Sequence, residues 1–172
     1  MMAGILAEIP VMSQARIIDA ALLDMVSAEA RISPRRRRNH NFHADDHAAC
    51  HRLLNAVEPD SYIPPHRHND PAKSESILVL RGRLGALFFD ERGKITDCAV
   101  LEPGGAAVGI NVPNGVFHTV LALTPNTVFF EAKAGPYLPL AADEKAPWAP
   151  GENEPGAAAY LAQLRDRLSA IE

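Results

Sequence analysis

Turn-forming sequences divide the middle of the chain, from about Cys50 to Ala134, into short runs with high β propensity. They recur at intervals of roughly eight to twelve residues, which leaves no room for the helical crossovers that parallel strands need. The clearest turn sequences lie at residues 58–60, 90–93, 102–105, 113–115 and 124–126. This spacing predicts a small antiparallel β-sandwich or barrel.

The runs between these turns predict about eight strands, which suits a jelly roll whose two sheets bury a shared interior. The expected strands are Leu53–Val57, Tyr62–His68, Glu75–Arg81, Leu84–Asp90, Ile95–Leu101, Ala106–Asn111, Val116–Leu123 and Val128–Lys133. The fold class expected from the sequence is therefore mainly β.

Helices are expected on both sides of this barrel. Ser13–Ala28 has apolar residues at helical spacing, and a second amphipathic pattern begins at Glu154-Pro155 and continues to Ile171. A proline-rich strap around Trp148 precedes the second helix. We divide the chain into a helix and an arginine-rich arm (1–45), a barrel (46–135), and a strap with a C-terminal helix (136–172). The arm, from Arg35 to His43, has no clear period and is expected to be an ordered arm or loop.

Composition limits the classes of partner. The 172 residues are 47% hydrophobic, enough for one domain with a substantial core, and the net charge of -4 gives no bulk attraction to nucleic acid or anionic membrane. The N-terminal residues lack the basic region of a signal peptide, and no apolar run approaches the length of a membrane span. We expect a cytoplasmic protein with no nucleic-acid or membrane partner and with reduced cysteines.

Three histidines and one glutamate form the strongest chemical pattern. In an extended strand His66 and His68 point to the same side, while Glu75 alternates with apolar residues and so does His118. Any one inward histidine is ordinarily a hydrogen-bonded core residue, but a buried carboxylate must be paired, protonated or bound to metal. Convergence of all four predicts a site for one divalent transition metal, with Fe, Mn, Ni, Co and Zn all compatible with mixed nitrogen and oxygen ligation.

Two segments resemble the conserved motifs of cupins. His66-x-His68, Glu75 and Gly82 are similar to the first cupin motif, and Pro113-x-Gly115-x-x-His118 is similar to the second. The loop from Asn69 to Ser74 is longer than in many cupins, and Ala122 stands where an asparagine is often found. The resemblance implies a jelly-roll fold with His66, His68, Glu75 and His118 as metal ligands.

Further stretches resemble the WbuC-type cupin fold metalloproteins. They comprise the arm 34–43, the segments 62–68, 115–118 and 130–137, and the strap 146–150. Members of that family are often encoded among genes for O-antigen and other surface polysaccharides, which implies a sugar-related small-molecule ligand. The likeness also implies that Arg38, Asn41 and His43 fold over the mouth of the pocket, where a guanidinium would bind phosphate or carboxylate. The alternative for the arginine run is a solvated surface segment.

Two more residues are candidates for contact with a ligand. Tyr62 is expected on the same strand face as the histidines, either as a hydrogen-bond donor and acid or as an aromatic wall residue. Lys133 shares a strand face with Glu131, and the two could pair with each other or reach the pocket.

The pattern leaves two functions open. One is a metal-dependent isomerase, epimerase or oxygenase acting on a small polar substrate such as a sugar or nucleotide-sugar. The other is a non-catalytic metal-containing module that binds or senses such a ligand. Antiparallel sandwiches also have exposed edges, and we expect a homodimer.

Overall fold

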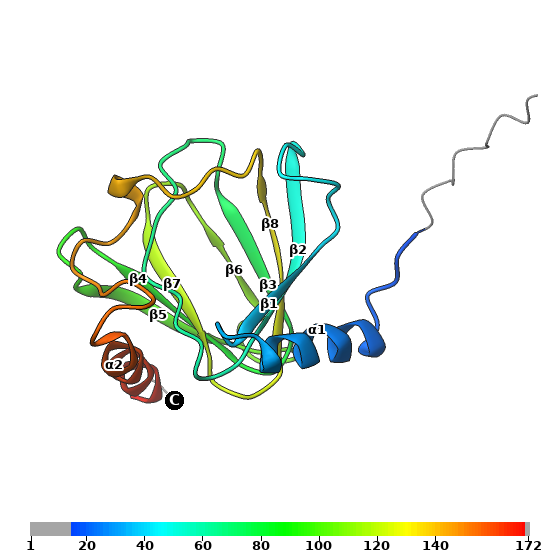
Figure 1. The fold of residues 1–172 in the computed structure, drawn as a ribbon. Helices are drawn as coiled ribbons and strands as arrows, with labels where there is room; N and C mark the ends of the chain where they lie inside the picture. The colour runs from blue at the N-terminus through cyan, green and yellow to red at the C-terminus, as the bar shows by residue number, and fades with distance from the viewer. Residues whose placement is uncertain (1–14, 171–172) are drawn as a thin grey trace, which may run out of the picture.

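The computed structural model describes residues 15–170, which form two antiparallel sheets packed face to face between two helices (Figure 1). A five-stranded sheet has the order β1-β2-β8-β3-β6, and a three-stranded sheet has the order β5-β4-β7. The strands are β1 (Arg37–Asn41), β2 (Cys50–Val57), β3 (Glu75–Arg81), β4 (Leu84–Phe89), β5 (Ile95–Leu101), β6 (Gly109–Val112), β7 (Phe117–Ala122) and β8 (Thr127–Ala134). This mainly β architecture, with a helix at each end, confirms the jelly-roll prediction.

Three apolar clusters hold the layers together. The first lies between the sheets and includes Ile77 and Leu84, and the second joins helix α1 (Ala20–Ile32) to the outer face of the five-stranded sheet. The third packs helix α2 (Ala157–Ser169) and the strap on the outer face of the three-stranded sheet. Burial of this apolar surface is the main stabilising contribution to the layered arrangement.

Seven of the eight expected strands correspond to β2–β8, with bounds that differ by zero to three residues. The exception is Tyr62–His68, which forms no continuous strand and contributes two isolated bridges, from His66 to His118 of β7 and from His66 to Lys145. Pro64 and Pro65 have no backbone N–H, so this segment cannot form a continuous ladder. It nevertheless holds its histidines beside the three-stranded sheet.

The arginine-rich arm is partly a strand, which corrects the expectation of an arm or loop. β1 pairs antiparallel with β2, from Arg37 opposite Val57 to Asn41 opposite Leu53. Charged and polar side chains along an edge strand carry no apolar alternation, because few of them face the core. The sequence therefore lacked the signal that usually identifies a strand.

Both helices differ in detail from their predicted ranges. α1 begins after Asp19, whose carboxylate accepts a hydrogen bond from the backbone N–H of Leu22 at 2.9 Å, and Ser13 lies outside the described residues. Its buried face includes Val26 and Ala30. α2 buries the expected leucines (Leu161, Leu164 and Leu168), while Ile171 lies outside the described residues. Within residues 15–170, no helix is long and apolar enough to span a membrane.

The strap is held by its tryptophan, as expected. Trp148 packs against Phe89 and Phe117, with ring centroids 4.8 and 6.0 Å apart.

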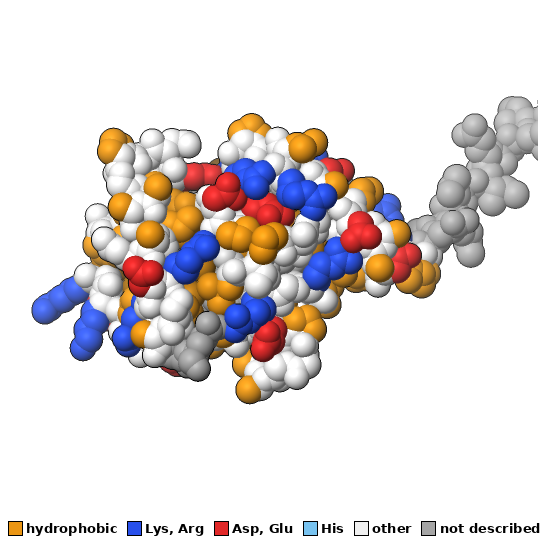
Figure 2. All heavy atoms as spheres, turned by 90° about the horizontal axis from the view of Figure 1, so that it is seen from below, with side chains coloured by type: hydrophobic (Ala, Val, Ile, Leu, Met, Phe, Trp, Pro, Cys, Tyr) orange, Lys and Arg blue, Asp and Glu red, His pale blue; other side chains and the backbone are white. Residues whose placement is uncertain are grey.

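On the face seen in Figure 2, basic and acidic side chains are interspersed, with hydrophobic side chains between them. This face therefore carries no extended patch of one charge sign.

We predict that Leu168→Ala lowers the free energy of unfolding by about 2–4 kcal/mol, because a fully buried leucine is lost where α2 meets Gly85 of the three-stranded sheet. Urea denaturation monitored by circular dichroism would measure the change. Gln163→Ala, at an exposed position of the same helix, is the matched control and should change the free energy by no more than about 0.5 kcal/mol. Equal effects of the two substitutions would contradict the assigned packing.

Candidate functional site

A chamber of about 120 Å³ lies between the two sheets. Three of the four predicted metal ligands line it (His66, Glu75 and His118), while His68 is not part of its lining. Its polar lining comes from both sides, and its apolar lining belongs to the cluster between the sheets. The lining residues are Arg37, Asn55, Val57, Ile63, His66, Glu75, Ile77, His118, Val120, Phe129, Glu131 and Lys133. The candidate site is therefore part of the core and shares its rigidity.

Strand alternation places these polar groups, as expected. Glu75 begins β3 on the face that carries Ile77, and His118 shares its side of β7 with Val120. His66 and His118 exchange both backbone hydrogen bonds, at 3.0 and 2.9 Å. This reciprocal pair fixes the proline-rich segment beside β7 and brings the two imidazoles together.

Glu75 is the buried centre of the polar cluster. Its side chain lies 2.8 Å from His118 Nε2, 3.5 Å from His68 Nε2 and 3.4 Å from Lys133 Nζ. Burial alone would raise the pKa of Glu75, but the two imidazoles and the Lys133 charge lower it well below its ordinary value. The carboxylate is thus ionised inside an otherwise apolar core.

The histidine tautomers suit coordination through Nε2. Nδ1 of His66 lies 3.1 Å from the carbonyl oxygen of Pro64, and Nδ1 of His118 lies 2.9 Å from that of Val116. A carbonyl only accepts, so each Nδ1 carries the proton and each Nε2 presents a lone pair when the ring is neutral. Such second interactions orient the histidines of metal sites. At 2.8 Å, His118 Nε2 and Glu75 Oε1 then require a proton or a cation between them.

The third histidine is close but not fully paired. His68 Nε2 is buried without a hydrogen-bond partner among the described residues, and its 3.5 Å separation from Glu75 Oε2 is too long for a good hydrogen bond. The ring centroid of His66 lies 5.4 Å from that of His68 and 4.7 Å from that of His118. The pKa of His66 is lowered to about 3, chiefly by burial and then by the neighbouring His118. His66 is therefore neutral near pH 7, and imidazole nitrogen is a donor type that suits transition metals.

The four side chains do not form an assembled metal centre in this arrangement. Within residues 15–170, no group of three or more His, Cys, Asp or Glu side chains is placed so that it could hold a metal ion. The direct contact between Glu75 and His118 accounts for this, because each uses a ligating atom on the other. The donor types, the Nδ1 contacts and the unpaired Nε2 of His68 fit a divalent metal after small side-chain movements.

Lys133 and Glu131 extend the polar cluster along β8. Lys133 Nζ lies 2.7 Å from Glu131 Oε1, and Asn55 Nδ2 donates to Glu131 Oε2 at 2.8 Å. Burial would lower the pKa of Lys133, but the charges of Glu131 and Glu75 outweigh it and raise this pKa. Lys133 therefore stays charged at the chamber, and Glu131 joins the set of pocket residues.

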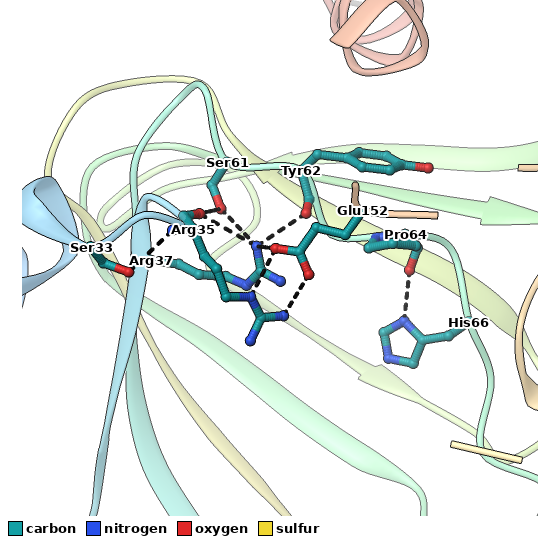
Figure 3. Close-up of polar contacts among 8 residues, drawn as sticks. All are labelled: Ser33, Arg35, Arg37, Ser61, Tyr62, Pro64, His66 and Glu152. Carbon is teal, nitrogen blue, oxygen red and sulfur yellow. Dashed lines mark hydrogen bonds and ion pairs between the residues drawn. The ribbon is translucent and has the colours of Figure 1, made fainter. Parts of the chain in front are cut away.

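Tyr62 does not reach the chamber. Its hydroxyl donates to the carbonyl oxygen of Pro150 at 2.9 Å, and its ring packs edge-on to Tyr160 on α2. Burial raises the pKa of this hydroxyl. Figure 3 shows the ring pointing away from His66. The expectation that Tyr62 shares the histidine face is wrong, because the segment is not a regular strand and its alternation is lost at the prolines.

The arm residues expected at the pocket mouth also lie elsewhere. Arg38 pairs with Glu29 of α1 at 3.2 Å, Asn41 is exposed, and His43 stacks on His51 with centroids 4.1 Å apart. The arginine that reaches the chamber is Arg37, one position earlier. Side chains alternate along β1, so Arg37 and Arg38 point to opposite faces of the sheet. Choosing between them requires the exact register of β1 on β2, which the sequence does not give.

A larger cavity of about 620 Å³, here called the vestibule, adjoins the chamber and shares Arg37, Ile63 and His66 with it. The proline-rich strap forms its opposite wall. Arg35 and Arg37 both contact the carboxylate of Glu152 from that strap (Figure 3). The volume falls in the range of small-molecule sites, about 300–1,000 Å³.

Comparisons with known proteins bear mainly on the fold. Residues 18–101, a little under half of the chain, match the model of a family described as Domain of unknown function (DUF6016). No curated protein matches the sequence. The matched segment contains His66, His68 and Glu75 but ends before His118.

Solved structures are similar at low sequence identity. A conserved protein of unknown function, SPY1581 from Streptococcus pyogenes, is 11% identical with a TM-score of 0.50, and the alignment covers 74% of this chain and 93% of that one. KdgF from a Halomonas species is 14% identical with a TM-score of 0.47, covering 60% and 83%. Bacillus subtilis oxalate decarboxylase, a protein with Mn(II) centres, is 15% identical with a TM-score of 0.44, covering 60% and 26%. The chain has a cupin-type fold.

The contact between the strap and the two arginines predicts a pH dependence. The Arg35 guanidinium lowers the pKa of Glu152, and Arg37 adds to the shift. The stabilisation is therefore complete above the unfolded-state pKa near 4.3 and is lost as pH falls through the lower folded value. Glu152→Gln should lower the free energy of unfolding by about 1 kcal/mol near neutral pH and by much less near pH 3.

Urea denaturation of both proteins at several pH values would measure this difference. Glu154→Gln is the matched control on the same strap, since Glu154 accepts from its neighbour Gly151 instead of from an arginine. A destabilisation by Glu152→Gln that does not change with pH would contradict the ion-pair assignment.

Proposed function

We propose that the chamber binds one divalent transition metal through His66, His68, Glu75 and His118. The observation that carries this proposal is the orientation of His66 and His118, whose Nδ1 atoms are held by backbone carbonyls. Nε2 of His118 lies against the buried carboxylate of Glu75, and the His66 ring lies 4.7 Å from the His118 ring. His68 Nε2 adds a third imidazole nitrogen without a hydrogen-bond partner among the described residues. Coordination would replace the hydrogen bond between Glu75 and His118.

Four protein ligands would leave an octahedral ion with two positions for water or ligand oxygen atoms. Three neutral imidazoles and one carboxylate leave about one positive charge on the ion, which favours an anionic or chelating ligand. When bound, the metal would act as a Lewis acid that polarises a ligand oxygen. The remaining chemistry would come from residues of this chain.

Lys133 and Glu131 are the residues best placed to act on such a ligand. Lys133 Nζ is charged and can donate a hydrogen bond to an anionic ligand oxygen, while Glu131 Oε2 is held by Asn55 and can accept one. The apolar wall formed by Ile77, Val120 and Phe129 would exclude bulk water from the reacting end. Tyr62 has no part in this proposal.

We favour a metal-dependent enzyme for a small, polar or anionic substrate such as a sugar or nucleotide-sugar. The likeness to WbuC-type proteins in the sequence supports the sugar-related substrate and a role in surface-polysaccharide metabolism. The charged donor and acceptor at the chamber, Lys133 and Glu131, could stabilise charge that develops on a substrate, and this favours turnover over simple binding. A non-catalytic ligand-binding module is the second candidate, since the same pocket holds a ligand equally well without chemistry.

Metal content provides the first test. Protein purified without a histidine tag, or reconstituted and desalted, should hold about one equivalent of a transition metal by elemental analysis. His66→Ala and Glu75→Ala should each reduce retention at least tenfold, because one ligand is lost. His47→Ala, at an exposed histidine, is the matched control and should retain metal normally. Retention below about a tenth of an equivalent in wild-type protein after reconstitution would refute the site.

Turnover provides the second test. Metal-loaded protein incubated with a panel of nucleotide-sugars should convert at least one of them. Lys133→Met should lower kcat at least tenfold, because the chamber loses the cation that stabilises negative charge on the substrate. Mass spectrometry and NMR would detect the product, including an epimer of unchanged mass. Tight binding of a panel member without conversion, with and without oxygen, would instead assign a binding module.

A further inference from the structure

The vestibule contains two arginines that share a single carboxylate. Arg35 contacts Glu152 through both oxygens, with Nε at 2.8 Å from Oε1 and Nη2 at 2.7 Å from Oε2. Arg37 Nη1 lies 2.8 Å from the same Oε1 (Figure 3). The two guanidiniums together therefore bind one oxyanion, Arg35 in bidentate geometry from a side chain that is 63% exposed.

Arg37 is fixed in place independently of the carboxylate. Its side chain is only 15% exposed, and Nη1 also donates to Ser61 Oγ and to the carbonyl oxygen of Tyr62, both at 3.1 Å. Ser61 Oγ in turn donates to the carbonyl oxygen of Arg35 at 2.7 Å. Removal of Glu152 would thus leave Arg37 oriented toward the vestibule, which is the condition for a specific anion site.

The charge around the vestibule is unbalanced toward positive. Its lining contains three basic residues (Arg35, Arg37 and Lys145) against two acidic ones (Glu152 and Glu154). Glu154 is engaged with the backbone N–H of Gly151, at 2.8 Å. One carboxylate therefore serves two guanidiniums, and burial lowers the pKa of Arg37 in spite of it. Arg37 is largely shielded from water and shares its one counter-ion with Arg35, so a further anion would bind favourably beside it.

Glu152 lies outside the sheets, unlike Arg37. It lies in a turn of the strap, between the proline-rich segment and α2, whereas Arg37 belongs to the five-stranded sheet. Among residues 15–170, its carboxylate contacts the two arginines. A carboxylate on a short connecting turn can move away without disturbing either sheet.

We propose that Arg35 and Arg37 bind a carboxylate or phosphate group of the ligand, and that Glu152 occupies this position until the ligand displaces it. Arg37 lines both cavities, so a ligand held there has its other end directed past His66 into the chamber. The ligand class is then a small molecule with an anionic group at one end and oxygen donors at the other. Binding of the second end at the chamber rests on the proposed metal site. Binding of the anionic end by Arg35 and Arg37 is independent of that site.

Anion binding to the chelator-treated full chain tests this proposal. Inorganic phosphate and acetate are titrated by calorimetry at constant ionic strength, so that general screening does not change. Glu152→Gln removes the internal competitor and should bind at least one of the two anions at least tenfold more tightly than wild-type protein. The preferred anion distinguishes a tetrahedral phosphate receptor from a planar carboxylate receptor.

Two further variants control the experiment. Adding Arg37→Met to Glu152→Gln should abolish the gain, and Glu154→Gln alone should leave anion affinity at the wild-type value. Equal anion affinity of Glu152→Gln and wild-type protein would overturn the proposal and leave the contact as a structural clamp. The proposal would also be overturned if the Glu152→Gln, Arg37→Met double variant bound the anion as tightly as Glu152→Gln alone.

A second readout covers the case in which Glu152→Gln does not fold. In wild-type protein, the side-chain Nε–H resonances of Arg35 and Arg37, assigned with arginine-to-lysine variants, should shift as phosphate or acetate is added. Resonances that do not move at anion concentrations up to about 100 mM would overturn the proposal, because an affinity of about 10 mM would give near-complete binding. Since no metal is present, this outcome is independent of metal binding by the chamber.

Discussion

The buried carboxylate of Glu75 sets the character of the interior. An ionised group in an apolar core is costly unless several partners compensate it, and His118, His68 and Lys133 supply that compensation from three different segments. Removal of one partner leaves an uncompensated charge, with a typical cost of about 3–5 kcal/mol. The position of each partner is therefore fixed by the same contact that makes the site chemically useful.

Strand alternation and one pair of backbone hydrogen bonds position Glu75 and its partners. Alternation along β3 and β7 turns Glu75 and His118 inward, and the reciprocal backbone bonds between His66 and His118 attach the proline-rich segment to the three-stranded sheet. The strap, held by Trp148, then encloses the vestibule outside the chamber. Arg37 lies at the junction of the two spaces. The anion end of a ligand would be held by β1 of the five-stranded sheet, and the metal end by residues from both sheets.

Much of this arrangement can be predicted from the sequence, and the features that cannot be predicted have physical reasons. Turn spacing predicts the antiparallel sandwich, and alternation around Glu75 and His118 predicts their convergence. Strand alternation does not predict the direction of Tyr62, because Pro64 and Pro65 prevent a continuous ladder in this segment and the Tyr62 hydroxyl donates to the strap. Arg37 was missed in favour of Arg38, since four consecutive arginines give no sign of which one faces inward until the pairing of β1 is known. The hydrogen bond from Asn55 that orients Glu131 joins residues far apart in the sequence, so the pattern along β8 alone does not predict it.

The central claim is that a buried carboxylate and three imidazoles share one cation. X-ray absorption spectroscopy of the reconstituted protein tests it most directly, because multiple scattering from imidazole rings counts the histidine ligands and the first shell gives metal–ligand distances. The account predicts one metal with about three imidazoles and additional oxygen ligands at roughly 2.0–2.2 Å. A first shell without imidazole, or one that is unchanged in Glu75→Ala and His118→Ala variants, would contradict it.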